Sequence, residues 1–323
     1  MFFIIRKISF LSFSTLTFGQ MKSIEAIKLQ LDSHLRDLNE IRNSKVSDPC
    51  VFVGAGDSYA AGLIAEFLTD HRCKCYSPSD LLNSRLTDEY TYCFISVTGK
   101  TKSNIIVAER AAEAGAKTIA ITLNKNSKLA QICEQAIPVK ITEINTPSDF
   151  ITFLANVITS LQVGGVAIPQ KFDVWHKEGM RLALNFSESI LLPLKDPIFF
   201  LGNNLSYCFA LYASLKVTEY FGITTIPHKL EEFCHSPIFG AKKSNSLWIF
   251  GQNEKPISLR LEKLGLDVHY FELYNEDILA RSFQSIFFLQ NLILLLAKRQ
   301  GLTRPRYLLN KEKLKTSSEL IYY

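Results

Sequence analysis

One pattern constrains the fold of this chain more than any other, and it occurs twice: an apolar segment, a glycine-containing turn and a helix-like segment. The first copy has its apolar segment at 50–53, its turn from Gly54 to Ser58 and its helical periodicity at 59–68. The second copy has these features at 197–201, at Gly202-Asn203-Asn204 and at 206–220. This order is typical of a strand that turns directly into a helix, the unit of parallel sheets. Two copies favour two α/β units over one continuous sheet.

The same alternation continues through most of the chain. Further strands are expected at 92–95, 118–122, 136–141, 247–251 and 268–271, and helices at 103–114, 128–135, 150–163, 172–191 and 286–296. Apolar residues at helical spacing between Ile24 and Ile41 predict a helix that starts near Met21. Strands that alternate with helices of this length indicate parallel sheets covered on both faces. We therefore predict two doubly wound, three-layer α/β domains.

The expected boundaries follow from breaks in this pattern. A leader of uncertain role occupies 1–20, a first domain 21–165, a linking helix 166–192, a second domain 193–300 and a C-terminal tail 301–323. The leader lacks a small-residue cleavage site and has its charges after its apolar patch, so it makes a poor signal peptide. The tail is basic and then polar, which is typical of a solvated end, although it could also cover an active site.

Composition excludes some classes of function. The chain has 323 residues, 47% hydrophobic and 21% charged, as in a soluble globular protein, and its net charge is only +5. No nucleic-acid motif accompanies the scattered basic residues, so nucleic acid is not an expected partner. The apolar run at 286–296 is too short for a bilayer, so we expect a buried helix, no membrane association and a cytoplasmic protein.

The cysteines do not form a metal or disulfide pattern. There are seven, and Cys73-Lys74-Cys75 has one intervening residue rather than the two of a common zinc knuckle. We expect reduced thiols buried in a core, and we interpret Cys234 as a packing residue rather than a nucleophile. No set of metal ligands is visible, and no cofactor is expected.

Two loops offer anion sites. Ser96-Val97-Thr98-Gly99-Lys100-Thr101 places three hydroxyls and the N–H groups around Gly99 at a helix start, where they can surround a phosphate. Without further support, a loop of this composition is more often an ordinary helix cap. The turn 54–56 equally permits a structural explanation, and it lacks the third glycine of a dinucleotide fingerprint, which disfavours a nucleotide-dependent oxidoreductase.

A carboxylate and an imidazole lie near each other in the second half of the chain. Glu219 precedes His235 by 16 residues. Sugar isomerisation needs one group that moves a carbon-bound proton and another that opens the ring, and these side chains can supply both. Combined with a phosphate loop, they suggest an enzyme that acts on a sugar phosphate.

At these residues the chain resembles a tandem sugar isomerase (SIS) domain protein, similar to the isomerase half of glucosamine-6-phosphate synthase. The resemblance covers roughly 51–309. Residues 96–101 fit the family's phosphate loop, residues 216–219 resemble its Lys-Leu-Lys-Glu, and residues 232–237 resemble its Glu-Leu-Lys-His-Gly-Pro. Nothing here resembles the synthase's glutaminase domain, so glutamine-driven synthesis is not expected.

The resemblance implies a role for each matched position. Glu219 would shuttle a proton between C1 and C2, and His235 would assist ring opening. The substrate and its phosphate would be held by Gly56, Asp57, Ser58, Ser96, Thr98, Gly99, Thr101, Lys216 and Glu232. Asp57 stands where the synthase has a hydroxyl residue, which puts its role in doubt.

One departure from the family affects the chemistry. The synthase ends with a lysine that reacts with or stabilises the open-chain sugar, and the aligned position here is Asn310. An amide cannot form a Schiff base, and only a shift of one residue would let Lys311 substitute.

The resemblance as a whole implies an isomerase or deaminase that enolises a hexose 6-phosphate of the glucosamine 6-phosphate/fructose 6-phosphate type. The alternative is a non-catalytic sugar-phosphate sensor. Related proteins form homodimers in which His235 would act on the neighbour's substrate.

Overall fold

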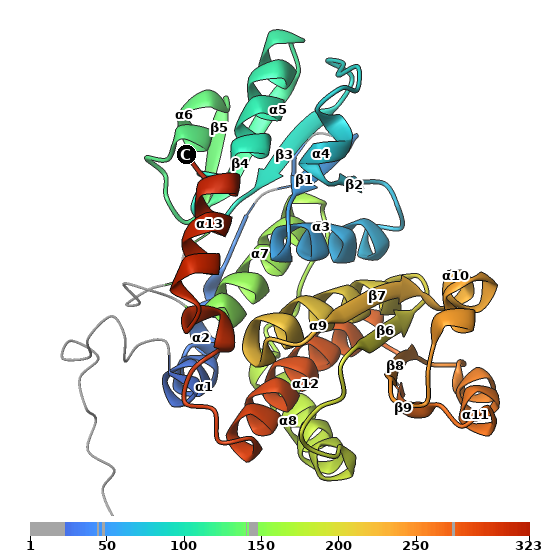
Figure 1. Ribbon diagram of the computed structural model, residues 1–323. Helices are drawn as coiled ribbons and strands as arrows, with labels where there is room; N and C mark the ends of the chain where they lie inside the picture. Colours follow the sequence, from blue (N-terminus) through green and yellow to red (C-terminus); the bar gives the residue numbers. More distant parts are fainter. Residues whose placement is uncertain (1–22, 44, 47–48, 140, 142–147, 273–274) are drawn as a thin grey trace, which may run out of the picture.

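The structure is a computed structural model that describes residues 23–323 except 44, 47–48, 140, 142–147 and 273–274 (Figure 1). The leader 1–20 and the expected helix start at Met21 lie outside the described residues, as does part of the expected strand 136–141.

The first half of the chain forms a parallel sheet of five strands in the order β2-β1-β3-β4-β5. The strands are β1 (Cys50–Gly54), β2 (Lys74–Tyr76), β3 (Thr91–Ile95), β4 (Lys117–Thr122) and β5 (Gln135–Pro138). The intervening helices are α3 (Asp57–Leu68), α4 (Pro78–Leu81), α5 (Lys102–Glu113) and α6 (Lys128–Ile132).

The second half forms a parallel sheet of four strands in the order β7-β6-β8-β9, which repeats the order of β2, β1, β3 and β4 in the first sheet. Its strands are β6 (Ile198–Gly202), β7 (Thr225–Lys229), β8 (Ser246–Gly251) and β9 (Asp267–Glu272). Its connections contain α9 (Leu205–Phe221), α10 (Leu230–His235), the 3-10 helix η2 (Pro237–Gly240) and α11 (Lys255–Lys263). The predicted α/β class with two parallel sheets flanked by helices is confirmed.

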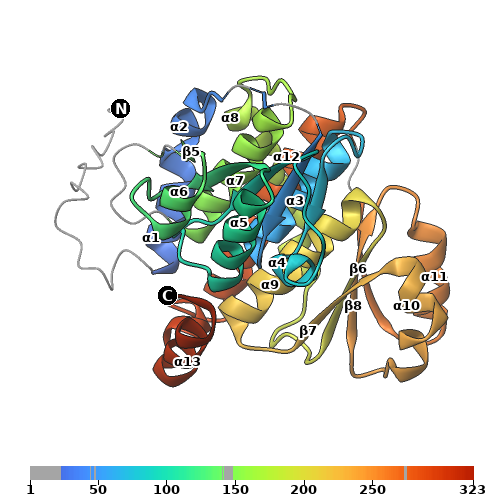
Figure 2. The same ribbon diagram turned by 90° about the horizontal axis from the view of Figure 1, so that it is seen from above.

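The other helices join and cover the two sheets (Figures 1 and 2). They are α1 (Ile24–Ser33), α2 (Leu35–Glu40), α7 (Asp149–Val163), α8 (Phe172–Ser189), α12 (Ile278–Arg299), the 3-10 helix η3 (Arg306–Leu308) and α13 (Lys311–Ile321). Helices α7, α8, α9 and α12 lie between or beside the two sheets, and α13 lies at the edge of the first sheet near α6 (Figure 1).

Alternate residues of each strand serve different cores, as expected for strands buried on both faces. In β1, Cys50 and Phe52 belong to a large core shared with α3, α7, α9 and α12, whereas Val51 and Val53 pack with α5 and α6 in a separate cluster. In β6, Phe200 joins the shared core. The two halves are therefore held together by one continuous apolar interior.

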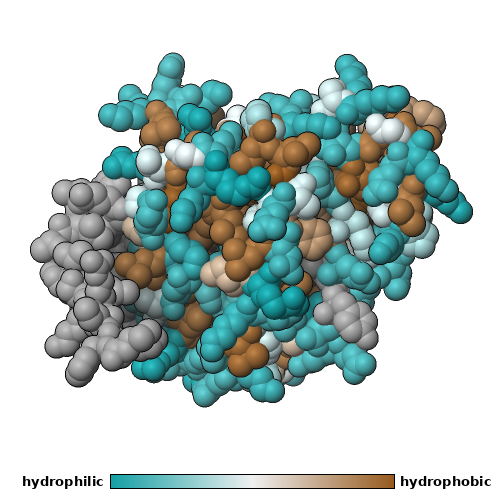
Figure 3. Space-filling model, turned by 90° about the horizontal axis from the view of Figure 1, so that it is seen from below, coloured by the Kyte–Doolittle hydropathy of each residue, from teal (hydrophilic) through white to brown (hydrophobic). Residues whose placement is uncertain are grey.

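Helix α12 is long and apolar enough to cross a membrane, but it is a core helix of this fold. Of its most apolar window, 72% is buried inside the protein, and the helix packs against α8 and α9. On the face seen in Figure 3, apolar side chains occur in groups interleaved with hydrophilic ones.

Several sequence predictions of local structure were wrong. The N-terminal helix divides at His34, whose Nδ1 lies 2.9 Å from Oδ2 of Asp37 and so marks a new helix start. The helix expected at 128–135 ends at Ile132, because the N–H of Glu134 donates to Oγ1 of Thr118 and draws the chain into β5. Cys234 is exposed rather than packed, whereas the other six cysteines are buried, and none of the seven forms a disulfide in the described structure.

Six strands and α-helices of the described structure had no prediction, namely β2, β7, α4, α10, α11 and α13. Strand β7 contains Pro227 and lies at a sheet edge, where a missing N–H is tolerated. Helix α13 has no buried residue, so it lacks the apolar stripe by which a packed helix is usually predicted.

Candidate active site

The main cavity of the described structure lies at the carboxyl ends of β1 and β3, the usual position for a ligand in a parallel sheet. Its volume is about 810 Å³. Most of its lining comes from the turn after β1, the loop after β3 with the start of α5, the start of α7, and the C-terminal segment from η3 to Tyr322. Glu219 enters from α9, so the cavity combines residues from both halves of the protein.

The loop after β3 gathers hydroxyl and backbone N–H groups at the start of α5. Oγ of Ser96 accepts a hydrogen bond from the N–H of Gly99 at 3.1 Å and lies 3.2 Å from Oγ1 of Thr101. Gly99 has φ +63°, and a Cβ there would lie 2.1 Å from Oγ of Ser127. Only glycine fits this backbone position, and the resulting turn leads directly into α5.

The turn after β1 brings a second helix start to the same cavity. Gly56 adopts φ 58° and ψ −127° and is the N-cap of α3. Asp57 and Ser58 follow as the first residues of that helix, and both line the cavity. The predicted substrate residues of this turn therefore lie opposite the predicted phosphate loop.

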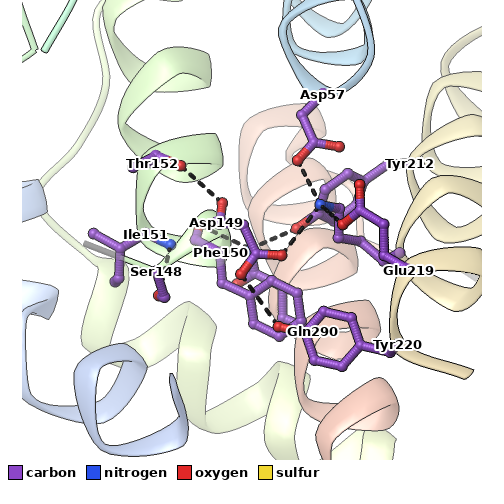
Figure 4. A network of polar contacts seen from close by, with 11 residues as sticks. Asp57, Ser148, Asp149, Phe150, Ile151, Thr152, Tyr212, Glu219, Tyr220 and Gln290 are labelled. Carbon is purple, nitrogen blue, oxygen red and sulfur yellow. Dashed lines mark hydrogen bonds and ion pairs between the residues drawn. The ribbon is translucent and has the colours of Figure 1, made fainter. Parts of the chain in front are cut away.

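Lys216 is the centre of a buried charge cluster. Its ammonium Nζ lies 2.6 Å from Oδ2 of Asp57, 2.6 Å from Oε2 of Glu219 and 3.2 Å from Oδ2 of Asp149. Figure 4 shows these three carboxylates converging on one nitrogen. Only 1% of the lysine side chain is exposed, and Lys216 does not line the cavity. It therefore orients the carboxylates rather than contacting a phosphate directly.

Burial and the charges within this cluster shift the pKa values of its own members. Burial raises the pKa of Glu219 to about 7, the Lys216 ammonium opposes this shift, and the charges of Asp57 and Asp149 add to it. Burial also raises the pKa of Asp57. Burial by itself would lower the pKa of Lys216, but the three carboxylates hold it well above its ordinary value. Glu219 thus has the pKa of a general base that works near neutral pH.

A layer of aromatic and amide groups supports the cluster. The hydroxyl of Tyr220 donates to Oδ1 of Asp149 at 3.2 Å, and Nε2 of Gln290 donates to the hydroxyl of Tyr212 at 3.0 Å. These side chains are buried, and the carboxylate of Asp149 is held by the Tyr220 hydroxyl on one oxygen and by the Lys216 ammonium on the other (Figure 4).

The C-terminal segment closes one side of the main cavity. Tyr322 forms an isolated antiparallel bridge with Thr101, and the N–H of Tyr323 donates to the carbonyl of Lys100 at 3.1 Å. Nζ of Lys102, at the start of α5, donates to the carbonyl of Glu319 at 2.6 Å. The end of the segment is therefore attached to the loop 96–101 and to the start of α5.

The structure brings most of the predicted site residues together. Those that line the main cavity are Gly56, Asp57, Ser58, Ser96, Thr98, Thr101 and Glu219. Gly99 shapes the phosphate loop from within, and Lys216 lies behind the carboxylates. Among the described residues, no group of three or more potential ligands could hold a metal ion.

Three predicted residues lie elsewhere in the same chain. His235 is exposed and lines a separate small hollow with Asn203 and Cys234. Glu232, on the same short helix, is exposed. Lys311 is exposed at the start of α13 and does not line the main cavity, whereas the side chain of Asn310 caps that helix.

Sequence reasoning missed many residues of the cavity, and four of them carry a charged or phenolic side chain. Asp149, Lys102, Tyr307 and Tyr322 all line it. The signal for Asp149 was available, because Ser148 and Asp149 begin an apolar helix and helix starts gather at this edge of a sheet. Nothing in the local sequence placed Tyr307 or Tyr322 there, since tertiary packing brings the C-terminal segment back to the first sheet.

Comparison with known proteins defines the fold. No family model and no curated protein matches this sequence. Among solved structures, glucosamine-6-phosphate deaminase from Thermotoga maritima is 20% identical with a TM-score of 0.67, covering 88% of this chain and 93% of that one. The C-terminal domain of glucosamine-fructose-6-phosphate aminotransferase from Francisella tularensis is 15% identical with a TM-score of 0.66, covering 91% and 99%.

A third similar structure is tagatose-6-phosphate ketose/aldose isomerase from Escherichia coli, 15% identical with a TM-score of 0.62, covering 87% of this chain and 89% of that one. The likeness extends over most of both chains in each case, at identities that establish fold only. The chain therefore has the fold of the SIS-type phosphosugar isomerases.

Proposed function

We propose that this protein, built from two tandem SIS-type domains, enolises a hexose 6-phosphate, as a sugar-phosphate isomerase or an amino-sugar-phosphate deaminase. One observation supports this most: Glu219, with its pKa raised to about 7, lies in the same cavity as the hydroxyl-lined loop 96–101. A general base near neutral pKa and an anion site are the two parts that such a reaction needs.

In the isomerase version, the loop 96–101 holds the phosphate and the opened sugar extends toward Glu219. The carboxylate of Glu219 removes the proton from C2 of the aldose while O1 takes a proton from water, which gives an enediol. Return of the carbon-bound proton to C1, with release of the O2 proton to water, gives the ketose and regenerates the carboxylate. Lys216 keeps the carboxylate oriented, and substrate orientation by the loop lowers the entropic barrier.

In the deaminase version, the sugar carries an amine at C2. The same proton transfer from C2 to C1 passes through an enolamine and gives an imine at C2. Water adds to that imine, and ammonia leaves to give fructose 6-phosphate. Both versions use the same base and the same phosphate loop.

His235 requires a second subunit in this proposal. Within one chain it lies at a hollow separate from the main cavity. We propose a homodimer in which His235 of each chain assists ring opening at the other chain's cavity.

The test mixes two inactive variants, Glu219→Gln and His235→Asn. About half of the dimers would then contain one chain of each kind, and one of the two sites in such a dimer would have both an intact Glu219 and an intact His235. The mixture should therefore regain about a quarter of the wild-type activity. A monomer in analytical ultracentrifugation, with no activity regained, would exclude this arrangement.

The test of enolisation is proton NMR of hexose and amino-sugar 6-phosphates in deuterated water. Enolisation replaces the hydrogen at C1 or C2 with deuterium even when no net product accumulates. We expect exchange that Glu219→Gln reduces by at least about 100-fold, as for loss of a general base. Glu113→Gln, at the exposed end of α5, serves as the control and should leave exchange unchanged. Released ammonia would identify the deaminase.

A non-catalytic sensor is the second candidate, and the lysines favour it. Lys102 is the only lysine among the residues described as lining the main cavity, and Lys216 is enclosed by carboxylates. Neither is placed to form a Schiff base with a sugar carbonyl. Measurable binding of sugar phosphates with no deuterium exchange for any of them would establish the sensor and reject the enzyme.

A further inference from the structure

A second hollow lies at the carboxyl ends of β6 and β8, apart from the main cavity. Its volume is about 490 Å³. Asn203, Asn204 and Ser206 line it from the turn after β6, Asn253 from the loop after β8, and Arg281 from α12. The end of α3 completes the wall with His71.

This second hollow is the counterpart of the main cavity in the repeated strand order. Gly54 and Gly202 end equivalent strands. A Cβ added at Gly54 would lie 2.7 Å from the backbone of Ser58, and one added at Gly202 would lie 2.6 Å from the backbone of Ser206. Both serines line their respective cavities. The fourth residues of α7 and α12, Thr152 and Arg281, also line them. The fold has thus built the same kind of concavity twice.

The turns after β1 and β6 differ in the residue at the N-cap of the following helix, and the difference costs backbone strain in the second turn. Gly56 has φ 58° and ψ −127°, and Asn204, at the equivalent N-cap position, has φ 49° and ψ −128°. Asparagine tolerates the left-handed helical region, but this ψ lies outside it, where glycine is favoured. Asp70 (φ 52°) and His71 (φ 57°) are the other non-glycine residues with positive φ in the described chain, and they also line the second hollow. Backbone strain that is kept at Asn204, beside this concavity, favours a functional role for its side chain.

The lining suits hydroxyl groups. Asn203, Asn204, Gln252 and Asn253 each carry a carboxamide, which both donates and accepts hydrogen bonds. Phe67 and Ile278 add apolar surface, and 45% of Ile278 is exposed. A hydroxyl-rich ring with an apolar face matches this combination.

The loop after β8 argues against a second phosphate site. Oε2 of Glu254 accepts a hydrogen bond from the N–H of Asn253 at 2.9 Å, so a carboxylate of the chain itself lies where the first half presents its phosphate loop. Asp70 and Glu254 also balance the charges that Arg281 and a protonated His71 would contribute to the lining. The hollow therefore favours a neutral ligand over a phosphate.

We propose that the second hollow binds a monosaccharide ring through the carboxamides of Asn203, Asn204 and Asn253, at a site distinct from the main cavity. This proposal does not depend on the reaction at Glu219. Asn204 is the residue on which the proposal depends, because glycine would fit the turn better and the asparagine side chain lines the hollow.

The experiment is a titration of isoleucine methyl groups by NMR, with glucose, glucose 6-phosphate and inorganic phosphate as separate probes. Ile278 reports on the second hollow and Ile106 on the main cavity. We expect glucose to shift the Ile278 methyl signal and to leave that of Ile106 in place. Inorganic phosphate should do the reverse.

The decisive variant is Asn204→Gly. It should raise the melting temperature by about 2 °C or more, because it removes backbone strain. It should also weaken glucose binding to the second hollow, measured from the Ile278 methyl signal, at least about tenfold. Asn253→Ala should weaken binding without a gain in stability. The proposal is overturned if glucose leaves Ile278 unshifted in the wild type, or if Asn204→Gly binds glucose as the wild type does.

Discussion

At the scale of single residues, Glu219 is the group on which the chemistry depends, and its titration can be measured. The base form is the carboxylate, so the exchange rate should rise with pH and level off above about 7, where burial has moved the pKa of Glu219. Asp149 is a negative neighbour that helps to raise this pKa. Asp149→Asn should therefore shift the rise of the pH profile to lower pH.

The measurement is the deuterium-exchange rate of a sugar 6-phosphate between pH 5 and 9 for wild type and variant. Asp173→Asn, on the exposed first turn of α8, is the matched control and should leave the profile in place. A profile that moves to higher pH in Asp149→Asn would contradict the proposed effect of that charge.

Gly99 provides a second prediction at this scale. Its φ of +63° and the 2.1 Å approach of a Cβ to Oγ of Ser127 leave no room for alanine. Gly99→Ala should cost roughly 1–3 kcal/mol of folding stability and should weaken phosphate binding, because the loop must open. Gly240→Ala, where an added Cβ meets nothing within 4 Å, should change neither property in calorimetric unfolding and phosphate titration.

At the scale of elements, the segment that contains α13 behaves as a cover that is attached at its far end. Helix α13 has no buried residue, yet Tyr322 and Tyr323 pair with the phosphate loop, and Leu320 and Ile321 line the main cavity. A helix with so little buried surface has low local stability, so these last contacts decide whether it stays closed.

We predict that a chain truncated after residue 310 folds but binds sugar phosphates at least about tenfold more weakly, since one wall of the cavity is lost. Circular dichroism would check the fold and calorimetric titration the affinity. Unchanged affinity would show that the cover contributes nothing to the site.

At the scale of the whole molecule, Lys216 connects the two halves. It lies on α9 of the second half, and two of its partners, Asp57 and Asp149, begin helices of the first. Removing the cation would leave three carboxylates close together beside the apolar interior. Lys216→Met should therefore cost about 3–5 kcal/mol of stability near neutral pH.

The stability lost in Lys216→Met should depend on pH in a definite direction. The folded-state pKa of Glu219 is raised above its unfolded value, and loss of Lys216 would raise it further, since the ammonium lowers it. The penalty should therefore grow as pH rises through the folded pKa and shrink in acid, where the carboxylates are protonated. Denaturant unfolding of Lys216→Met at pH 5 and 8 measures this, with Lys177→Met on exposed α8 as control. A loss that is larger at pH 5 would contradict the account.

The sequence by itself determined the class of fold and one loop of the site. Glycines at 54 and 202, each between an apolar strand and a helix, predicted the two parallel sheets, because backbone sterics at those turns are local. The hydroxyls of Ser96, Thr98 and Thr101 line the main cavity, and their role in holding a phosphate stays a prediction. The separation of Glu219 and His235 along the chain did not determine their separation in space.

Only the tertiary structure decided which charges meet. Asp57, Asp149 and Glu219 come from three helices that are far apart in sequence, and one buried lysine draws them together. No local pattern reports such a contact, and the perturbed pKa of Glu219 arises from burial that packing creates. The return of Tyr322 to Thr101 is likewise a tertiary contact, made across most of the length of the chain. Local sterics fixed the elements, whereas long-range burial and electrostatics fixed the site.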